Sequence, residues 1–333
     1  MNYLKLVRLP NLLFLGLVIS AMFWCVLDPM LAKLYCIQEI PQAGLIFGLM
    51  LCAALFTAAS GYVINDYFDT KIDEINRPTQ VIVGHGVSRQ QAATFFTVLL
   101  CIGLAAGLAL SFLLKSLILS LIYVGMAGAL WFYSSSYKRM LIVGNLIVSL
   151  CVFMAVFLVG YVVFIALRNE YEAGIQMLVD ANPAYYNSLL RPFYSVLKWS
   201  AAFGAVAALL TWMREIVKDL QDRKGDAEME CRTMAIVWGE KVSKVVITLL
   251  AVATVVLISW LIRQLPFGEN QWTHYAFAYV FMPAMVASIV GLWMAKNIRD
   301  YRILSNVLKG IMLLGTLYMP LLAYLFSTLN PNC

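Results

Sequence analysis

Long apolar runs separated by short polar segments fill the whole chain, and this pattern predicts its elements. A helix that crosses a bilayer needs about 17–25 mainly apolar residues. Nine runs reach that length, at roughly residues 10–27, 43–64, 92–113, 116–134, 141–166, 197–217, 243–263, 274–295 and 303–327. None shows the alternation of polar and apolar residues that is typical of a barrel strand. We therefore expect an all-α, polytopic membrane protein with nine transmembrane helices, because a helix satisfies its own backbone groups in lipid.

Composition supports this class and indicates one unit. With 62% hydrophobic and 13% charged residues among 333, the chain has too little polar surface for a soluble globule of its size. We expect a single membrane domain over residues 1–333. Its one sizeable polar interruption, residues 168–198, lies between the fifth and sixth spans, and we expect an outer-face insertion of one or two short interfacial helices there.

The distribution of basic residues predicts the orientation. If the N-terminus is cytoplasmic, 18 of the 24 Lys and Arg residues lie on that side. Only six lie on the other side: Lys33, Lys115, Arg168, Arg191, Lys198 and Arg263. The positive-inside rule favours this arrangement, with the C-terminus outside, in the cell (inner) membrane. The net charge of +6 is thus a consequence of topology, and we expect no nucleic-acid partner.

Two acidic motifs with identical spacing follow apolar runs, both on the expected cytoplasmic side. The pattern Asp-x-x-Asp-x-x-x-Asp occurs at Asp66, Asp69 and Asp73 and again at Asp219, Asp222 and Asp226. Positions i, i+3 and i+7 share one face of a helix. Asn65 adds an amide oxygen four residues before Asp69.

So many carboxylates beside a membrane need a cationic partner, and Mg²⁺ fits best. It takes oxygen ligands from a few carboxylates and from the phosphate oxygens of a substrate. Basic residues that could bind a diphosphate lie on the same side: Arg77, Lys138, Arg139, Arg214 and Lys218. One such motif alone is more often a solvated loop, but the repeat indicates a site. A cation-coupled transporter remains a second interpretation, although transport sites lie near the bilayer midplane rather than at one edge.

The motifs, in order, resemble a known family. They are Asn65-Asp66-x-x-Asp69-x-x-x-Asp73-x-x-x-Arg77-Pro78, Tyr133-Ser134-x-x-x-Lys138-Arg139, Gly144-Asn145, and Asp219-x-x-Asp222-x-x-x-Asp226 followed by Arg232-Thr233. This series is similar to the UbiA superfamily of intramembrane prenyltransferases over nearly the whole chain. The run Arg214-Glu215-Ile-Val-Lys218-Asp219 looks most like the branch that contains digeranylgeranylglyceryl phosphate synthase.

The resemblance implies nine helices around a central cavity with cytoplasmic cap loops, and an Mg²⁺-dependent transfer from an allylic prenyl diphosphate to a lipophilic acceptor from the bilayer. It implies metal binding by Asn65, Asp69, Asp219 and Asp222, supported by Asp66, Asp73 and Asp226. Arg77, Lys138 and Arg139 would hold the diphosphate. Tyr133 would lie near the reacting carbon, and ring faces of Phe68, Trp131, Phe132 or Tyr133 could stabilise a carbocation.

The donor implied by this branch is geranylgeranyl diphosphate, which releases diphosphate in the transfer, and the implied acceptor is geranylgeranylglyceryl phosphate. An aromatic quinone precursor, of the 4-hydroxybenzoate or dihydroxynaphthoate type, stays open as the alternative acceptor.

Overall fold

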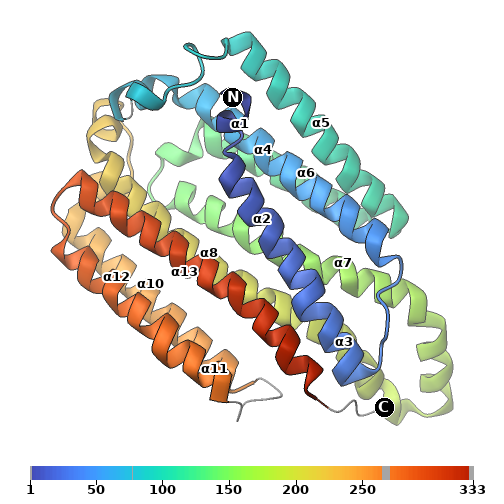
Figure 1. Cartoon of the computed structure of the whole chain (residues 1–333). Coiled ribbons are helices and arrows are strands. Elements are labelled where there is room, and N and C mark those ends of the chain that lie inside the picture. Colours follow the sequence, from blue (N-terminus) through green and yellow to red (C-terminus); the bar gives the residue numbers. More distant parts are fainter. Residues whose placement is uncertain (1, 77, 265–270, 330–333) are drawn as a thin grey trace.

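The computed structural model describes residues 2–76, 78–264 and 271–329, and these residues fold almost entirely into helices (Figure 1). In chain order the elements are α1 (Asn2–Leu6), α2 (Leu9–Ala21), η1 (Met22–Leu27), α3 (Asp28–Tyr35), α4 (Ala43–Asn76), η2 (Pro78–Gln80), α5 (Arg89–Leu113), α6 (Leu117–Ser135), η3 (Tyr137–Arg139), α7 (Val143–Ala181), η4 (Pro183–Tyr185), α8 (Tyr186–Glu228), α9 (Met234–Val237), α10 (Gly239–Ile262), α11 (Gln271–Tyr275), η5 (Ala276–Phe281), α12 (Met282–Met294) and α13 (Ile298–Ser327). Within the described residues, nine helical stretches are long and apolar enough to cross a membrane. The nine predicted spans and the all-α class are therefore confirmed.

The first and eighth spans each contain a wide π turn before a proline. The turn η1 precedes Pro29, and η5 precedes Pro283. Proline has no N–H and its ring collides with the carbonyl one turn earlier, so a regular α-helical ladder cannot pass through it. The wider turn lets each helix continue across the proline instead of ending there.

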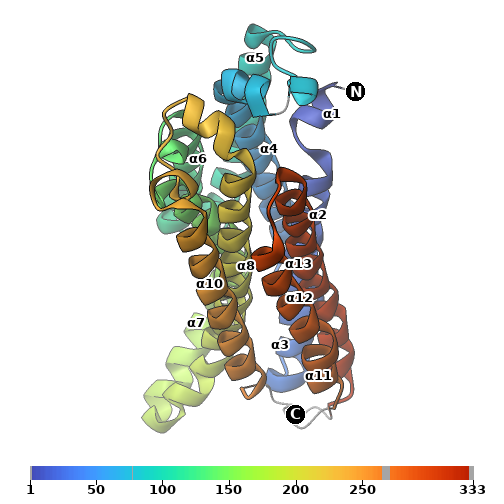
Figure 2. The same cartoon turned by 90° about the vertical axis from the view of Figure 1, so that its left-hand side faces the viewer.

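The bundle is elongated, and its helices run side by side along the long axis (Figures 1 and 2). The helices α4 and α5 pack along each other, as do α7 and α8, and α8 also contacts α10 and α13. Small residues allow this close approach: a Cβ at Gly103 of α5 would lie 2.8 Å from the backbone nitrogen of Thr57 on α4. Such small-residue contacts are the usual means of helix association in membranes.

One sequence expectation about a polar segment is wrong. Residues 168–198 do not form separate interfacial helices, because α7 and α8 continue as one long hairpin that turns only at η4. Figure 2 shows the end of α7 projecting beyond the bundle. The helix α4 also extends beyond its apolar run, to Asn76. The extensions of α4 and α7 contain no proline, and Gly174 alone does not end α7, so each helix continues past the apolar run that predicted it.

A central cavity of about 1640 Å³ lies between the helices. Residues from α2, α4, α6, α7, α8, α10, η5 and α13 line it, and most of this wall is apolar. At one end the wall is polar, and loop residues Thr79, Ile82, Arg139 and Thr233 contribute to it. The expected cavity with loops over one end is thus present.

Candidate active site

Both acidic motifs line the polar end of the cavity, one on α4 and one on α8. Asn65, Asp66, Asp69 and Asp73 face it from α4, and Asp219, Asp222 and Asp226 face it from α8. The two helix ends are joined where the motifs finish, because the backbone N–H of Gly225 donates to Asn76 Oδ1 at 3.0 Å. The spacing of the motifs therefore brings seven oxygen-bearing side chains to one place.

The first motif is held by basic and amide partners. Asn65 Nδ2 donates to Asp69 Oδ2 at 2.8 Å, and Asp69 also forms an ion pair with Lys138. Arg8, just before the first span, reaches Asp66 Oδ1 at 2.7 Å. These contacts orient the carboxylates of α4 toward the cavity and offset their repulsion.

In the second motif, Asn145 of α7 orients the first carboxylate. Its Nδ2 donates to Asp219 Oδ2 at 2.8 Å. Asp219 keeps its other oxygen available for a ligand, as a carboxylate has acceptor sites on both oxygens.

The short helix η3 places Lys138 and Arg139 at the cavity. Gly144 permits this packing, since a Cβ there would lie 2.7 Å from the Cα of Lys138. The carbonyl of Arg139 accepts a hydrogen bond from the backbone N–H of Arg232 at 2.8 Å, which links the two loops that follow α6 and α8. Burial, and then the charge of Arg139, lower the pKa of Lys138 to about 7, while Asp66 and Asp226 act in the opposite direction.

The oxygen atoms of the two acidic motifs suit an Mg²⁺ ion that is also coordinated by a bound ligand. In the described part of the chain, no three His, Cys, Asp or Glu side chains lie close enough together to hold a metal by themselves. The carboxylates come from two helices that border one cavity, and a phosphate between them would supply the remaining oxygens. Carboxylate and amide oxygens are the ligands that a hard cation prefers.

The structure separates the aromatic residues that the sequence left as alternatives. Of the four rings considered as cation stabilisers, Tyr133 alone lines the cavity. Phe68 packs edge-on against Trp131 at 5.8 Å, and Trp131 also packs against Phe96 of α5. Trp131 and Phe132 are exposed on the outside of the bundle, so these rings face away from the cavity. Trp131 and Phe132 directly precede Tyr133, and successive residues of a helix point in different directions. The two rings therefore lie on other faces of α6.

The other predicted diphosphate ligands differ in their surroundings. Arg77 lies outside the described residues. Arg214 and Lys218 line the cavity, but both bind Glu215, at 3.2 Å and 2.8 Å. The three side chains form a buried group on α8 beside the acidic motif.

The sequence reading assigned no site role to Arg8, Asn145, Glu215 or Lys309, all of which point into the site or hold its members. Arg8 and Lys309 were counted only as topology signals. Lys309 did carry a usable signal, because a charged residue within an apolar span is costly unless it faces a cavity.

Comparisons with known proteins agree with this geometry. A model of the UbiA prenyltransferase family matches residues 26–308. The digeranylgeranylglyceryl phosphate synthase of Methanopyrus kandleri is 30% identical over 282 residues, which cover 83% of this chain and 85% of that protein. The synthase of the same name from Methanobrevibacter smithii is 28% identical over 244 residues, covering 73% of this chain and 71% of the relative.

Solved structures share the fold. A structure described as giving insights into digeranylgeranylglyceryl phosphate synthase in membranes has a TM-score of 0.58 and 23% identity, and covers 97% of each chain. A UbiA homolog from Archaeoglobus fulgidus, bound to GPP and Mg²⁺, has a TM-score of 0.54 and 15% identity, and covers 96% of this chain and 99% of that one. Fold, family model and curated relatives agree, and the chain belongs to the UbiA prenyltransferase family.

Proposed function

We propose that this prenyltransferase moves a prenyl group, in an Mg²⁺-dependent reaction, from an allylic polyprenyl diphosphate to a lipophilic acceptor drawn from the bilayer. The observation that carries the proposal is the uneven polarity of the central cavity. Its acidic motifs, Lys138 and Arg139 lie at one end, and a long apolar wall continues from them. Its volume of about 1640 Å³ exceeds the roughly 300–1,000 Å³ of ordinary small-molecule sites, as two long-chain substrates would require.

The diphosphate of the donor would bind between α4 and α8. Asn65, Asp69, Asp219 and Asp222 would hold Mg²⁺, with Asp66, Asp73 and Asp226 in support, and bound Mg²⁺ would neutralise charge on the diphosphate oxygens. Lys138 and Arg139 would donate to the diphosphate from η3. Arg77 would join them.

In the transfer step, the bond between the first prenyl carbon and the diphosphate oxygen breaks, and the diphosphate leaves with the electron pair. The acceptor's hydroxyl oxygen forms the new bond to that carbon, and its proton passes to the departing diphosphate. Tyr133 lines the cavity, so the face of its ring would be available to stabilise the reacting carbon. The apolar wall excludes water, which would otherwise capture the allylic cation.

We propose geranylgeranyl diphosphate as the donor and geranylgeranylglyceryl phosphate as the acceptor. The relatives named digeranylgeranylglyceryl phosphate synthase support this choice. An aromatic quinone precursor is the alternative. We also propose that the N-terminus and the polar end of the cavity face the cytoplasm, because this side holds most Lys and Arg residues.

The test is prenyl transfer by the full-length protein in proteoliposomes, with labelled geranylgeranyl diphosphate and either acceptor class. We expect labelled ether lipid, abolished by EDTA and restored by Mg²⁺. Asp69→Ala and Asp222→Ala should each lower the rate by at least about 100-fold, as loss of a charge-stabilising group usually does. Glu74→Gln is the matched control, since Glu74 is an exposed acid on α4 that does not line the cavity. Unchanged rates in both Asp variants would refute the metal-site assignment, and transfer to hydroxybenzoate alone would replace the acceptor.

A further inference from the structure

A cluster of basic side chains lines the cavity beside the acidic motifs. It comprises Arg8, Arg214, Lys218 and Lys309, and all four line the cavity. Arg214 precedes Asp222 by eight residues on α8, which is about 12 Å along a helix axis. Arg214 therefore lies deeper in the bundle than Asp222, whereas Lys218 and Arg8 lie next to the acidic motifs.

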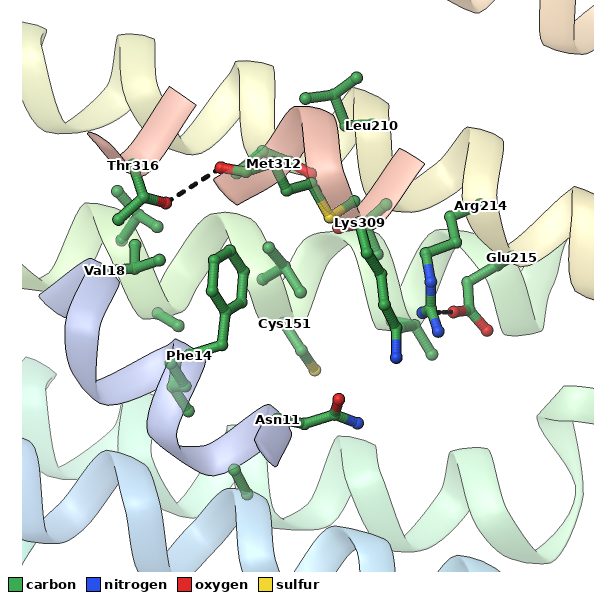
Figure 3. Close-up of a pocket in the computed structure, with 18 of the residues that line it drawn as sticks. Asn11, Phe14, Val18, Cys151, Leu210, Arg214, Glu215, Lys309, Met312 and Thr316 are labelled. Atoms are coloured by element: carbon green, nitrogen blue, oxygen red, sulfur yellow. Dashed lines mark hydrogen bonds and ion pairs between the residues drawn. The ribbon is translucent and has the colours of Figure 1, made fainter. Parts of the chain in front are cut away.

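Lys309 is the member of this cluster without a counter-charge. Figure 3 shows it extending from α13 into the cavity between Cys151 and Arg214, with Asn11 of α2 opposite. Within the described residues, Lys309 makes no hydrogen bond or ion pair. The cations Arg214, Lys218 and Arg8 and the carboxylate of Glu215 are among the charges that act on it.

Two acidic side chains of this region, Glu215 and Asp66, already bind other cations. Glu215 bonds Arg214 at 3.2 Å and Lys218 at 2.8 and 2.9 Å, and Asp66 bonds Arg8 at 2.7 Å. Three like charges thus surround Lys309 in a largely apolar cavity, where such repulsion is poorly screened. The Nε atom of Arg214 is buried and has no hydrogen-bond partner in the described structure. Without an anion, the repulsion between these cations and the unpaired Nε atom both cost free energy. A bound anion would offset both.

A phosphate monoester suits the cluster in charge and shape. Its oxygens accept hydrogen bonds from ammonium, guanidinium and amide groups, which Lys309, Arg214, Lys218 and Asn11 supply. The donor's diphosphate is accounted for at the Asp motifs, so the anion here belongs to the second substrate. In a glyceryl phosphate, the attacking hydroxyl and the phosphate sit on neighbouring carbons, so the phosphate must bind close to the reacting prenyl carbon. Tyr133, which we place near the reacting carbon, lines the same cavity.

We infer that Lys309, with Arg214 and Lys218, binds the phosphate of the acceptor and selects an anionic glycerolipid over an uncharged one. This inference rests on the proposed function, which supplies the reaction. It moves Arg214 and Lys218 from the donor's diphosphate, where their sequence predicted them, to the acceptor. It makes Lys309 a specificity-determining residue on a helix that carries neither acidic motif.

The experiment compares geranylgeranylglyceryl phosphate with geranylgeranylglycerol, the same acceptor without phosphate. The full-length protein is assayed in non-ionic detergent without phospholipid or phosphate buffer, so that neither headgroups nor free phosphate compete. The wild type should prefer the phosphorylated acceptor. Lys309→Met should raise the KM for geranylgeranylglyceryl phosphate by about 10- to 100-fold, the usual effect of losing a charged hydrogen bond. The KM for geranylgeranyl diphosphate, and the kcat/KM for the uncharged acceptor, should stay within about twofold.

Lys309→Arg should retain most of the preference, and inorganic phosphate should compete with the acceptor in the wild type but only weakly in Lys309→Met. Arg302→Met is the matched control, because Arg302 is an exposed cation on the same helix that does not line the cavity. An unchanged acceptor KM in Lys309→Met, with an active wild type, would overturn the inference and leave the proposed function intact. A wild type that prenylates neither glycerol acceptor would overturn the acceptor we propose, and this inference with it. An unchanged donor KM shows that the variant's site is folded.

Discussion

Individual side chains of the site are oriented by neighbours that no motif spacing reveals. Asp219 is the clearest case, because its partner Asn145 lies 74 residues earlier on α7. A hydrogen bond to one oxygen fixes the direction in which the other oxygen points. The geometry of the second acidic motif thus depends on a helix that contributes no acid to it.

Asn145→Ala should therefore weaken the metal dependence of the reaction without removing a ligand. Loss of an orienting partner typically costs about 10- to 100-fold in metal affinity or activity. We expect the Mg²⁺ concentration for half-maximal transfer to rise by about that factor, measured in proteoliposomes with saturating donor. Ser149→Ala is the control, since its hydroxyl bonds only the carbonyl of Asn145 on its own helix. Equal Mg²⁺ curves for Asn145→Ala and wild type would contradict this role.

At the scale of elements, the site depends on the fixed register of α4 and α8. Gly225 and Asn76 set that register where the two motifs end, because the N–H of Gly225 donates to Asn76 Oδ1 at 3.0 Å. There is no room for a side chain at this crossing, since a Cβ at Gly225 would lie 2.5 Å from the same oxygen.

Gly225→Ala should push the helix ends apart and lower both stability and rate. Overpacking of this kind costs about 1–3 kcal/mol, measurable as a lower thermal unfolding temperature in detergent. The double variant Asn76→Ala/Gly225→Ala should recover part of the loss, because the clashing amide is gone. Gly291→Ala, at a helix position with nothing within 4 Å, should be neutral or slightly stabilising. A Gly225→Ala protein as stable and active as wild type would show that the register is not set here.

The long hairpin of α7 and α8 offers a second prediction at this scale. Residues 176–187 are nearly all exposed, and none lines the cavity. Replacing them with a four-residue Gly-Ser linker should leave kcat and both KM values within about threefold. Packed helices lie about 8–10 Å apart, and four extended residues span that distance. A large loss of transfer activity would mean that the hairpin contributes to substrate binding.

The sequence predicted the spans and the two motifs because both depend on local patterns. Apolar length decides a span, and the spacing of Asp66, Asp69 and Asp73 decides a helix face. It could not predict that Arg8 meets Asp66, or that Lys309 meets Arg214, since helix packing determines which distant residues become neighbours. It also left the place of Trp131 open, because an apolar ring suits either the cavity or the lipid-facing surface, and only the rotation of α6 selects one.

For the whole molecule, the distribution of basic residues and the polar end of the cavity indicate the same orientation in the membrane. The basic excess and the carboxylate end lie on one side of the predicted topology, so the diphosphate site would face the compartment where soluble diphosphates are made. The hairpin turn between α7 and α8 would lie on the opposite side, since an odd number of spans separates it from the turn after α4.

Single cysteines can test this orientation in intact cells. His85, in the turn after α4, and Asn187, at the start of α8, are both exposed. On a background without the native thiols, a membrane-impermeant maleimide should label Asn187→Cys in intact cells and His85→Cys only after permeabilisation. The free energy of moving several Lys and Arg residues across the membrane makes the inverted topology strongly unfavourable, so mixed labelling is not expected. Labelling of His85→Cys in intact cells would reverse the orientation. It would also put the acidic motifs, with the diphosphate site we propose for them, on the outer side of the membrane.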